Sequence, residues 1–193
     1  MIFELLHAPF PDGYGEAILS LDDCKLHLRV DLDEDDDLIA ALRDASIDFV
    51  ERYCAVKLMA TQGNIWTASR FPGHITRALK LGISPVREIA SVSWRSLTGD
   101  VVSGTPNRFS FTSRGDVLPA IGADWPNMVA GGIEIEFSAG YDAGKAPPAL
   151  LSAVRMFLGH LYKNREAVTD RGIEAEVPFG VRQLCSTFRR AVI

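Results

Sequence analysis

The sequence predicts an α+β protein: a helical core of two long helices plus short N- and C-terminal helices, with an inserted small antiparallel β subdomain. Apolar residues recur at helical spacing over residues 37–55 and again over 148–165. Between these two segments, short runs of β-forming residues are separated by glycine and proline. The predicted organisation is an extended N-terminal arm over 1–19, a helical core over 20–56 and 147–193, and a β-rich insertion over 57–146.

The first half of the predicted core contains two helices. Ser20 suits the N-cap of the first, because its hydroxyl oxygen can accept a bond from a first-turn N–H, and the two aspartates that follow favour the helix dipole. This helix is predicted to end near Val30. The acidic run at 33–37 starts a second helix that ends near Ala55. Its expected apolar stripe is Leu38, Leu42, Ala45, Phe49 and Tyr53, with Ile39, Ser46 and Val50 beside it.

The middle section changes to a period of two residues. The clearest case is 133–137, where apolar and acidic residues alternate as they do in a half-exposed strand. Residues 98–100 (TGD) are typical of a turn. Other strands are predicted at 65–67, 78–81, 89–94 and 108–111. The prolines are expected to keep all of these strands short; they are Pro72, Pro85, Pro106, Pro119 and Pro126.

The second half of the core begins at Pro147 and Pro148, since proline is tolerated in the first turn of a helix. A wide apolar face follows. Gly159 lies within it at a cost of about 1 kcal/mol relative to alanine, which favours a close contact between helices. A final short basic helix is predicted over 179–190, with Val181, Leu184, Cys185 and Phe188 on one side.

Composition excludes several classes of protein. The 193 residues are 47% hydrophobic and 23% charged, which is typical of a globular chain, and the net charge of −5 gives no basic field for wrapping nucleic acid. No apolar run approaches the roughly 18 residues that a membrane span needs. The first residues carry an early acid and no basic start, so no signal peptide is expected. Three widely spaced cysteines indicate reduced thiols in a cytosolic setting.

The acidic run does not predict a calcium site. An EF-hand loop needs glycine at its sixth position and glutamate at its twelfth. Counting from Asp31 places Asp36 and Leu42 at those positions, and counting from Asp33 also fails. We expect helix-capping charge on a solvated surface, and no metal or cofactor.

No catalytic motif is present either. His27, His74 and His160 are scattered, and we expect structural roles for them. A nucleophile formed by Cys54 and His160 is formally possible, but the neighbours of Cys54 indicate a buried core thiol. The three tryptophans could stack on a ligand, although core or interface positions are commoner for tryptophan in strands; they are Trp66, Trp94 and Trp125.

The last thirty residues are basic, in contrast to the acidic first half. These charges either solvate helix ends or dock the segment on an acidic protein groove or on phosphates. Both interpretations remain open on composition alone.

Several segments, in this order and spacing, resemble the head–tail connector (adaptor) family of long-tailed bacteriophages, prophages and gene-transfer particles. The resemblance spans about residues 18–190. It rests on 25–31 (KLHLRVD), 33–36 (DEDD), 50–53 (VERY), 81–86 (LGISPV), 92–94 (VSW), 137–141 (FSAGY), 160–166 (HLYKNRE) and 177–181 (VPFGV).

The resemblance implies a structural protein without catalysis or cofactor. Copies would form a closed ring, typically of twelve, beneath the portal protein in the neck of a particle assembled in the bacterial cytoplasm. DNA would pass through the lumen without sequence-specific binding, and a stopper or tail-terminator protein would bind the opposite face. The C-terminal segment would dock on the portal through Phe179, Arg182, Phe188, Arg189 and Arg190. Glu134 and Glu136, exposed on the last predicted strand, are candidates for a lumen or rim surface that repels DNA.

Two other functions are considered. A small hydrolase-type enzyme would need a convergent cluster of titratable groups, for example His74, Asp116 and Arg87 lining a pocket. Another neck component, such as a stopper or tail terminator, would be more purely β, so the strong helices at 37–55 and 148–165 favour the connector.

Overall fold

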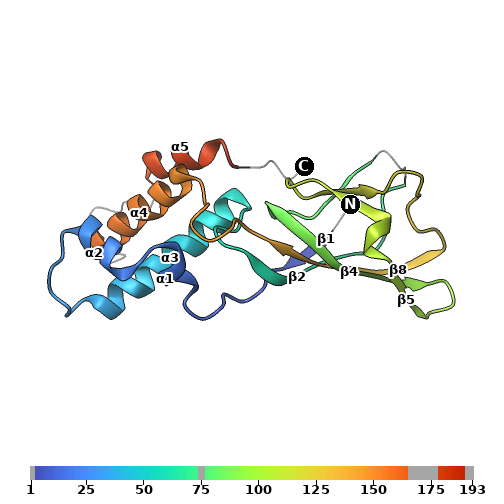
Figure 1. Cartoon of the computed structure of the whole chain (residues 1–193), viewed down its shortest axis with the longest axis horizontal. Helices are drawn as coiled ribbons and strands as arrows, with labels where there is room; N and C mark the ends of the chain where they lie inside the picture. The colour runs from blue at the N-terminus through green and yellow to red at the C-terminus, as the bar shows by residue number, and fades with distance from the viewer. Residues whose placement is uncertain (1–2, 74–76, 165–177, 190–193) are drawn as a thin grey trace, which may run out of the picture. The chain divides into compact units, whose positions relative to one another are not determined.

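A computed structural model describes residues 3–73, 77–164 and 178–189, and they divide into two compact units (Figure 1). The β unit comprises Met1–Pro11 and Ala60–Gly140, and the helical unit comprises Asp12–Met59 and Tyr141–Ile193. The chain therefore enters the β unit twice, because both its N-terminal segment and its central segment contribute strands.

The helical unit contains five α-helices among the described residues. They are α1 (Tyr14–Ile18), α2 (Leu21–Leu28), α3 (Asp36–Cys54), α4 (Pro148–Lys163) and α5 (Phe179–Ser186). The Ser20 hydroxyl accepts a hydrogen bond from the Asp23 N–H at 3.1 Å, which confirms the predicted N-cap of α2. The end of α3 is also confirmed, because Ala55 adopts the left-handed conformation that closes many helices. The four helices predicted from the sequence are therefore present.

The buried face of α3 differs from the predicted one. Ala45 is exposed, and Leu42, Phe49 and Tyr53 are only half-buried. The buried residues are Ile39, Arg43, Ser46, Ile47, Val50, Glu51 and Cys54. The apolar pattern predicted the wrong centre for the buried face of α3, because two charged residues, Arg43 and Glu51, lie on that face. Partners on other segments neutralise their charges.

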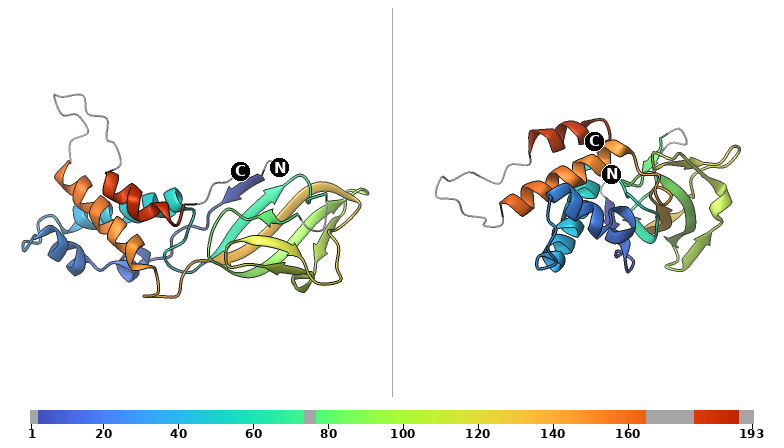
Figure 2. Two further views of the ribbon diagram at one scale, coloured as in Figure 1. Left: turned by 90° about the horizontal axis from the view of Figure 1, so that it is seen from above. Right: turned by 60° about the vertical axis from the view of Figure 1, so that its left-hand side comes forward.

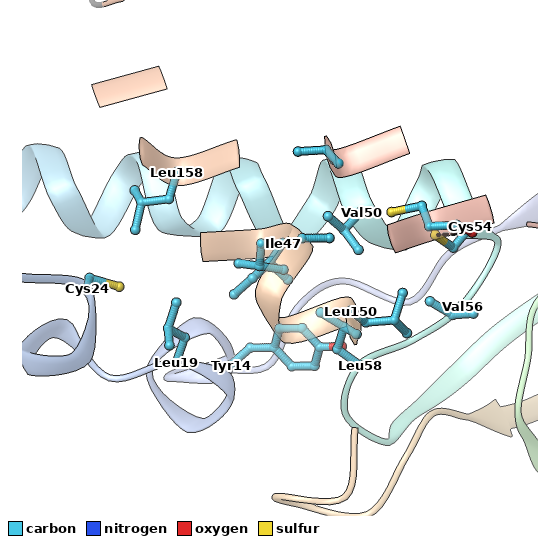
Figure 3. Close-up of a cluster of buried hydrophobic side chains, with 14 of the residues drawn as sticks. Tyr14, Leu19, Cys24, Ile47, Val50, Cys54, Val56, Leu58, Leu150 and Leu158 are labelled. Carbon is cyan, nitrogen blue, oxygen red and sulfur yellow. Dashed lines mark hydrogen bonds between the residues drawn. The ribbon is translucent and has the colours of Figure 1, made fainter. Parts of the chain in front are cut away.

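The core of the helical unit lies where α3, α4 and α5 pack together (Figures 1 and 2). Figure 3 shows Ile47, Val50, Leu150 and Leu158 among the buried side chains of this core. At its border, the rings of Phe49 and Phe157 stack with centroids 4.2 Å apart. The predicted apolar face of α4 is therefore the face that buries α4 against α3.

Gly159 faces α2, but with room to spare. A Cβ atom there would lie 3.5 Å from His27 Nε2, which is an ordinary van der Waals contact. Gly159→Ala is therefore expected to raise the free energy of unfolding by up to about 1 kcal/mol through helix propensity, as measured by urea denaturation. Gly15→Ala in α1 is the contrasting variant, because its Cβ would collide with the Asp44 and Arg43 side chains. Destabilisation by Gly159→Ala would show that the α2–α4 contact needs glycine after all.

The β unit consists of two antiparallel sheets. The larger has five strands in the order β1-β2-β8-β4-β5, namely β1 (Phe3–Leu6), β2 (Thr61–Ala68), β8 (Val129–Ala139), β4 (Val86–Ser96) and β5 (Val101–Gly104) (Figure 1). The smaller has the order β3-β7-β6, namely β3 (Leu79–Lys80), β7 (Asp116–Pro119) and β6 (Phe109–Phe111), with a short 3₁₀ helix at Pro106–Arg108. All five strands predicted from the sequence are present, and β1, β5 and β7 are additional.

Aromatic side chains pack with aliphatic ones in the core of the β unit. Trp66 stacks on Phe3, and Phe71 contacts both Trp94 and Trp125. Trp66 and Trp125 are buried, and Trp94 is half-buried. The three tryptophans therefore pack among protein side chains.

The predicted fold class is wrong in its proportions. The β part is not a small insertion in a helical core, because its described residues form eight strands in two sheets and include the N-terminal segment as β1. Strands β4 and β8 each have 11 residues. The prolines did not shorten them because all five lie outside these two strands. The full length of β4 was hard to recognise because this strand carries register shifts, including one between Ile89 and Ser91, that interrupt the two-residue alternation.

Candidate interaction surfaces

The C-terminal helix α5 has one buried and one exposed side. Val181 and Cys185 are fully buried in the core of the helical unit. On the exposed side, Arg182 is exposed and Phe179 is 80% exposed, which is unusual for an aromatic ring. The structure thus presents an apolar ring and a guanidinium group on one short helix, as a docking segment requires.

The other predicted docking residues are placed differently. Phe188 is half-buried and packs against the core of its own unit. The Arg189 guanidinium carbon lies 4.9 Å from the centre of the Tyr53 ring, which is a cation–π contact within the chain. Arg190 lies outside the described residues. Of the five residues, Phe179 and Arg182 are therefore the two whose described surroundings leave them most open to a partner.

Four glutamates share the outer face of the five-stranded sheet. Directly opposite residues of paired strands point to the same face, and the register places Glu4, Thr67, Glu134, Ser93 and Ser103 in one row across the sheet. Glu136 follows in the next row, opposite Ser91. Glu88, opposite Ser138, lies on this face as well. The predicted pair Glu134 and Glu136 thus belongs to a larger acidic face that the sequence did not reveal, because β1 was not recognised.

A buried polar cluster lies at the C-terminal end of α3. Glu51 and Lys57 form an ion pair with 2.9 Å between Oε2 and Nζ, and both side chains are almost fully buried. The Tyr14 hydroxyl donates to Glu51, and the Leu58 N–H donates to the same carboxylate at 2.7 Å. Burial raises the pKa of Glu51, whereas Lys57 and the hydrogen-bond donors act in the opposite direction. Because both side chains of the pair are almost fully buried, the cluster stabilises the helical unit rather than forming a site open to solvent.

Arg43 is the second charged residue on the buried face of α3. Its guanidinium pairs with Glu16 of α1 and with Asp44, and both carboxylates remain about half exposed. The pair with Glu16 connects α1 to α3, whereas Asp44 is the next residue of α3 itself. The sequence offered no signal for this role, because an arginine at helical spacing reads as a solvated residue until its partners are known.

The residues considered on the sequence for catalysis have the following surroundings. The Cys54 thiol is buried, and its hydrogen bond with Cys185 together with burial raises its pKa, so the reactive thiolate is disfavoured. His160 Nδ1 lies 3.3 Å from the Asn164 amide nitrogen. His74 lies outside the described residues, while Asp116 contacts Thr112 and Arg87 donates to the Gly140 carbonyl.

The acidic run before α3 is compensated locally. Lys25 of α2 pairs with Asp33 and Asp36, with Nζ–Oδ1 distances of 2.6 and 2.8 Å. Within the described ranges, no three His, Cys, Asp or Glu side chains are grouped as metal ligands. The described residues also contain no helix that is long and apolar enough to cross a membrane.

Part of the chain matches a known protein family. Residues 18–82, which span α2, α3 and the strand β2, match the family described as phage gp6-like head-tail connector protein. The predicted resemblance is confirmed. No curated protein matches the chain.

The whole chain is also similar to chains in solved structures. The neck of an empty gene transfer agent (GTA) particle, computed with C6 symmetry, contains a chain with a TM-score of 0.74. The virion of the native GTA particle gives 0.71, and the neck of the native particle, computed with C12 symmetry, gives 0.70. In each case the identity is 22%, and the match covers 100% of this chain and 97% of the other. These likenesses show that the chain shares the fold of the matched chains.

Proposed function

We propose that this protein is a structural head–tail connector subunit in the neck of a phage or phage-like particle, with no catalytic step. The observation that carries the proposal is the match of the whole chain, in both units, to a chain from a GTA neck, together with the connector-family match over residues 18–82. The presence of α3 and α4 favours a connector over a stopper or tail terminator, which would be more purely β.

Copies of the chain form a closed ring of twelve beneath the portal protein, and DNA passes through the lumen. The C6 and C12 symmetry of the GTA necks supports a ring. A ring that closes by rotation needs two different complementary patches on each subunit. A stopper or tail-terminator protein binds the opposite side of the ring, and assembly takes place in the bacterial cytoplasm.

The charge of the chain suits a channel for sliding DNA. Twelve copies at −5 carry about −60 in total, and negative charge releases no counterions from DNA and so provides no grip. We assign the acidic face around Glu134 and Glu136 to the lumen or rim.

This assignment predicts slower DNA ejection from particles that carry both Glu134→Lys and Glu136→Lys. The reason is that two lysines replace two carboxylates in every subunit, and lysine side chains bind phosphate. Ejection is followed by dye binding to released DNA at several salt concentrations, and the slowing should weaken as salt rises. The control variant is Asp31→Lys with Glu34→Lys, which makes the same charge change on exposed residues of the helical unit. Equal ejection rates for both variants and the native protein would contradict the assignment.

The C-terminal helix docks on the portal through Phe179 and Arg182, with Phe188, Arg189 and Arg190 completing the segment. Phe179→Ser with Arg182→Glu is expected to weaken portal binding about tenfold or more, because exposed aromatic and arginine anchors dominate interfaces of this kind. Binding is measured by the mass of the protein alone and mixed with its portal. Point variants are preferable to deletion of residues 178–193, since the deletion would also remove the buried Val181 and Cys185.

The matched control for docking is Leu26→Ser with Arg52→Glu, which alters an exposed leucine and an exposed arginine elsewhere in the helical unit. This variant should bind the portal as the native protein does. Unchanged binding by the Phe179 and Arg182 variant would show that the docking surface lies elsewhere.

A further inference from the structure

The five-stranded sheet ends in two different open edges. Strand β1 pairs only with β2, and β5 pairs only with β4, among the residues that the structure describes. Backbone N–H and C=O groups on the outer side of an edge strand can pair with a further strand from another chain. The sheet therefore offers two non-equivalent edges, each of four residues.

Apart from their short length and the charge of Glu4, the two edges lack the features that usually prevent pairing. Phe3–Leu6 and Val101–Gly104 contain no proline and no lysine, and Glu4 is their only charged residue. Each strand also exposes a large aliphatic side chain: Leu6 is 63% exposed and Val101 is 67% exposed. The register places both on the outer face of the sheet. Such edges indicate contact with a partner strand.

The directions of the two edge strands suit a second copy of this chain. Four successive antiparallel pairings separate β1 from β5, so these two strands run in the same direction. Neighbours in a ring of twelve are related by a rotation of about 30°, which leaves strand directions almost unchanged. The β5 edge of one copy can therefore meet the β1 edge of the next as a parallel pair of equal length.

We propose that β5 of each subunit pairs with β1 of the next, so that the five-stranded sheets join around the ring. This inference rests on the proposed ring. The row Glu4, Thr67, Glu134, Ser93 and Ser103 then continues from copy to copy, and the acidic face becomes a continuous band. A four-residue strand pair makes few hydrogen bonds, each of small net value, so it holds only when other contacts or the portal bring the copies together.

Cysteine cross-linking in assembled particles tests the pairing. Glu4→Cys with Ser103→Cys places thiols on the two edges at opposite ends of one row, and Glu4→Cys with Val101→Cys covers a shift of two residues. Mild oxidation with copper phenanthroline should give a ladder of covalent multimers of this chain on a non-reducing gel, with at least one of the two pairs. Thr67→Cys with Ser93→Cys, on the inner strands of the same row, should give none.

A second variant tests the edge without cross-linking. Val101→Lys puts a charge on an exposed edge position, so it should leave the fold intact but reduce ring incorporation at least tenfold. Ile121→Lys, at a fully exposed position outside any strand, is the control and should assemble normally.

The outcomes separate this inference from the proposed function. Rings that contain this chain but yield no ladder with either pair, and that tolerate Val101→Lys, would overturn the edge pairing and leave the connector function standing. Particles whose necks lack the chain altogether would overturn the proposed function. A covalent product between this chain and a different neck protein would show that the edges serve another partner.

Discussion

Replacing Glu51 with alanine is expected to lower the free energy of unfolding by about 3–5 kcal/mol, because the change leaves Lys57 buried without its carboxylate partner. The same substitution removes the acceptor of the Tyr14 hydroxyl and the Leu58 N–H. Both donors lie in a buried region where water cannot replace the lost bond. The effect is measured by chemical denaturation, followed by the loss of helical circular dichroism.

Two further variants show which part of this effect comes from the unpaired charge. Asp48→Ala breaks an exposed ion pair with Arg52 on the same helix and should cost no more than about 0.5 kcal/mol. Glu51→Leu with Lys57→Met removes both buried charges together and should be much less harmful than Glu51→Ala. If Glu51→Ala and Asp48→Ala cost the same, the buried pair is not the stabilising element that the structure indicates.

Glu51 also makes stability depend on pH in a defined direction. Burial raises its pKa above the ordinary value of 4.5, so the folded chain holds this proton more tightly than the unfolded chain. The contribution of this group to the free energy of unfolding is therefore greatest below pH 4.5 and declines as the pH rises through the folded-state pKa. Glu51→Gln should flatten that decline in denaturation curves recorded from pH 4 upward.

Val181→Asp is the second substitution with a large expected effect. Val181 is fully buried at the contact of α5 with the core, and an aspartate there would place a carboxylate among apolar side chains. We expect α5 to detach or the helical unit to lose about 3–5 kcal/mol of stability. Hydrogen exchange of the α5 amides, together with denaturation, distinguishes local detachment from global unfolding.

The neighbouring residue provides the control for this prediction. Arg182→Asp makes a similar chemical change one residue along α5, at an exposed position, and should alter stability by no more than about 0.5 kcal/mol. The contrast separates a folding role of α5 from its proposed docking role. Equal destabilisation by the two variants would mean that α5 does not pack as described.

Helices were predictable where local rules fix them. Ser20 caps α2, Ala55 closes α3, and Pro148 opens α4, because each of these depends on hydrogen bonds or backbone geometry within a few residues. Strand β8 was recognised for a similar reason, since its outer face is polar and its inner face apolar. The buried side of α5 was predictable as well, because the spacing of Val181 and Cys185 placed both on one side of this helix, and both are buried.

By itself, the sequence determined the existence and order of the main helices and strands, and a resemblance to head–tail connectors carried by short local segments. Only the tertiary structure decided which face of α3 is buried, that β1 joins β2, and that Glu4 and Glu88 complete an acidic face with Glu134 and Glu136. The physical reason is that these features depend on partners far away in the chain. Arg43 and Glu51 can lie on a buried face because Glu16, Tyr14 and Lys57 satisfy them, and β1 can form a strand because β2, more than fifty residues later, supplies its hydrogen bonds.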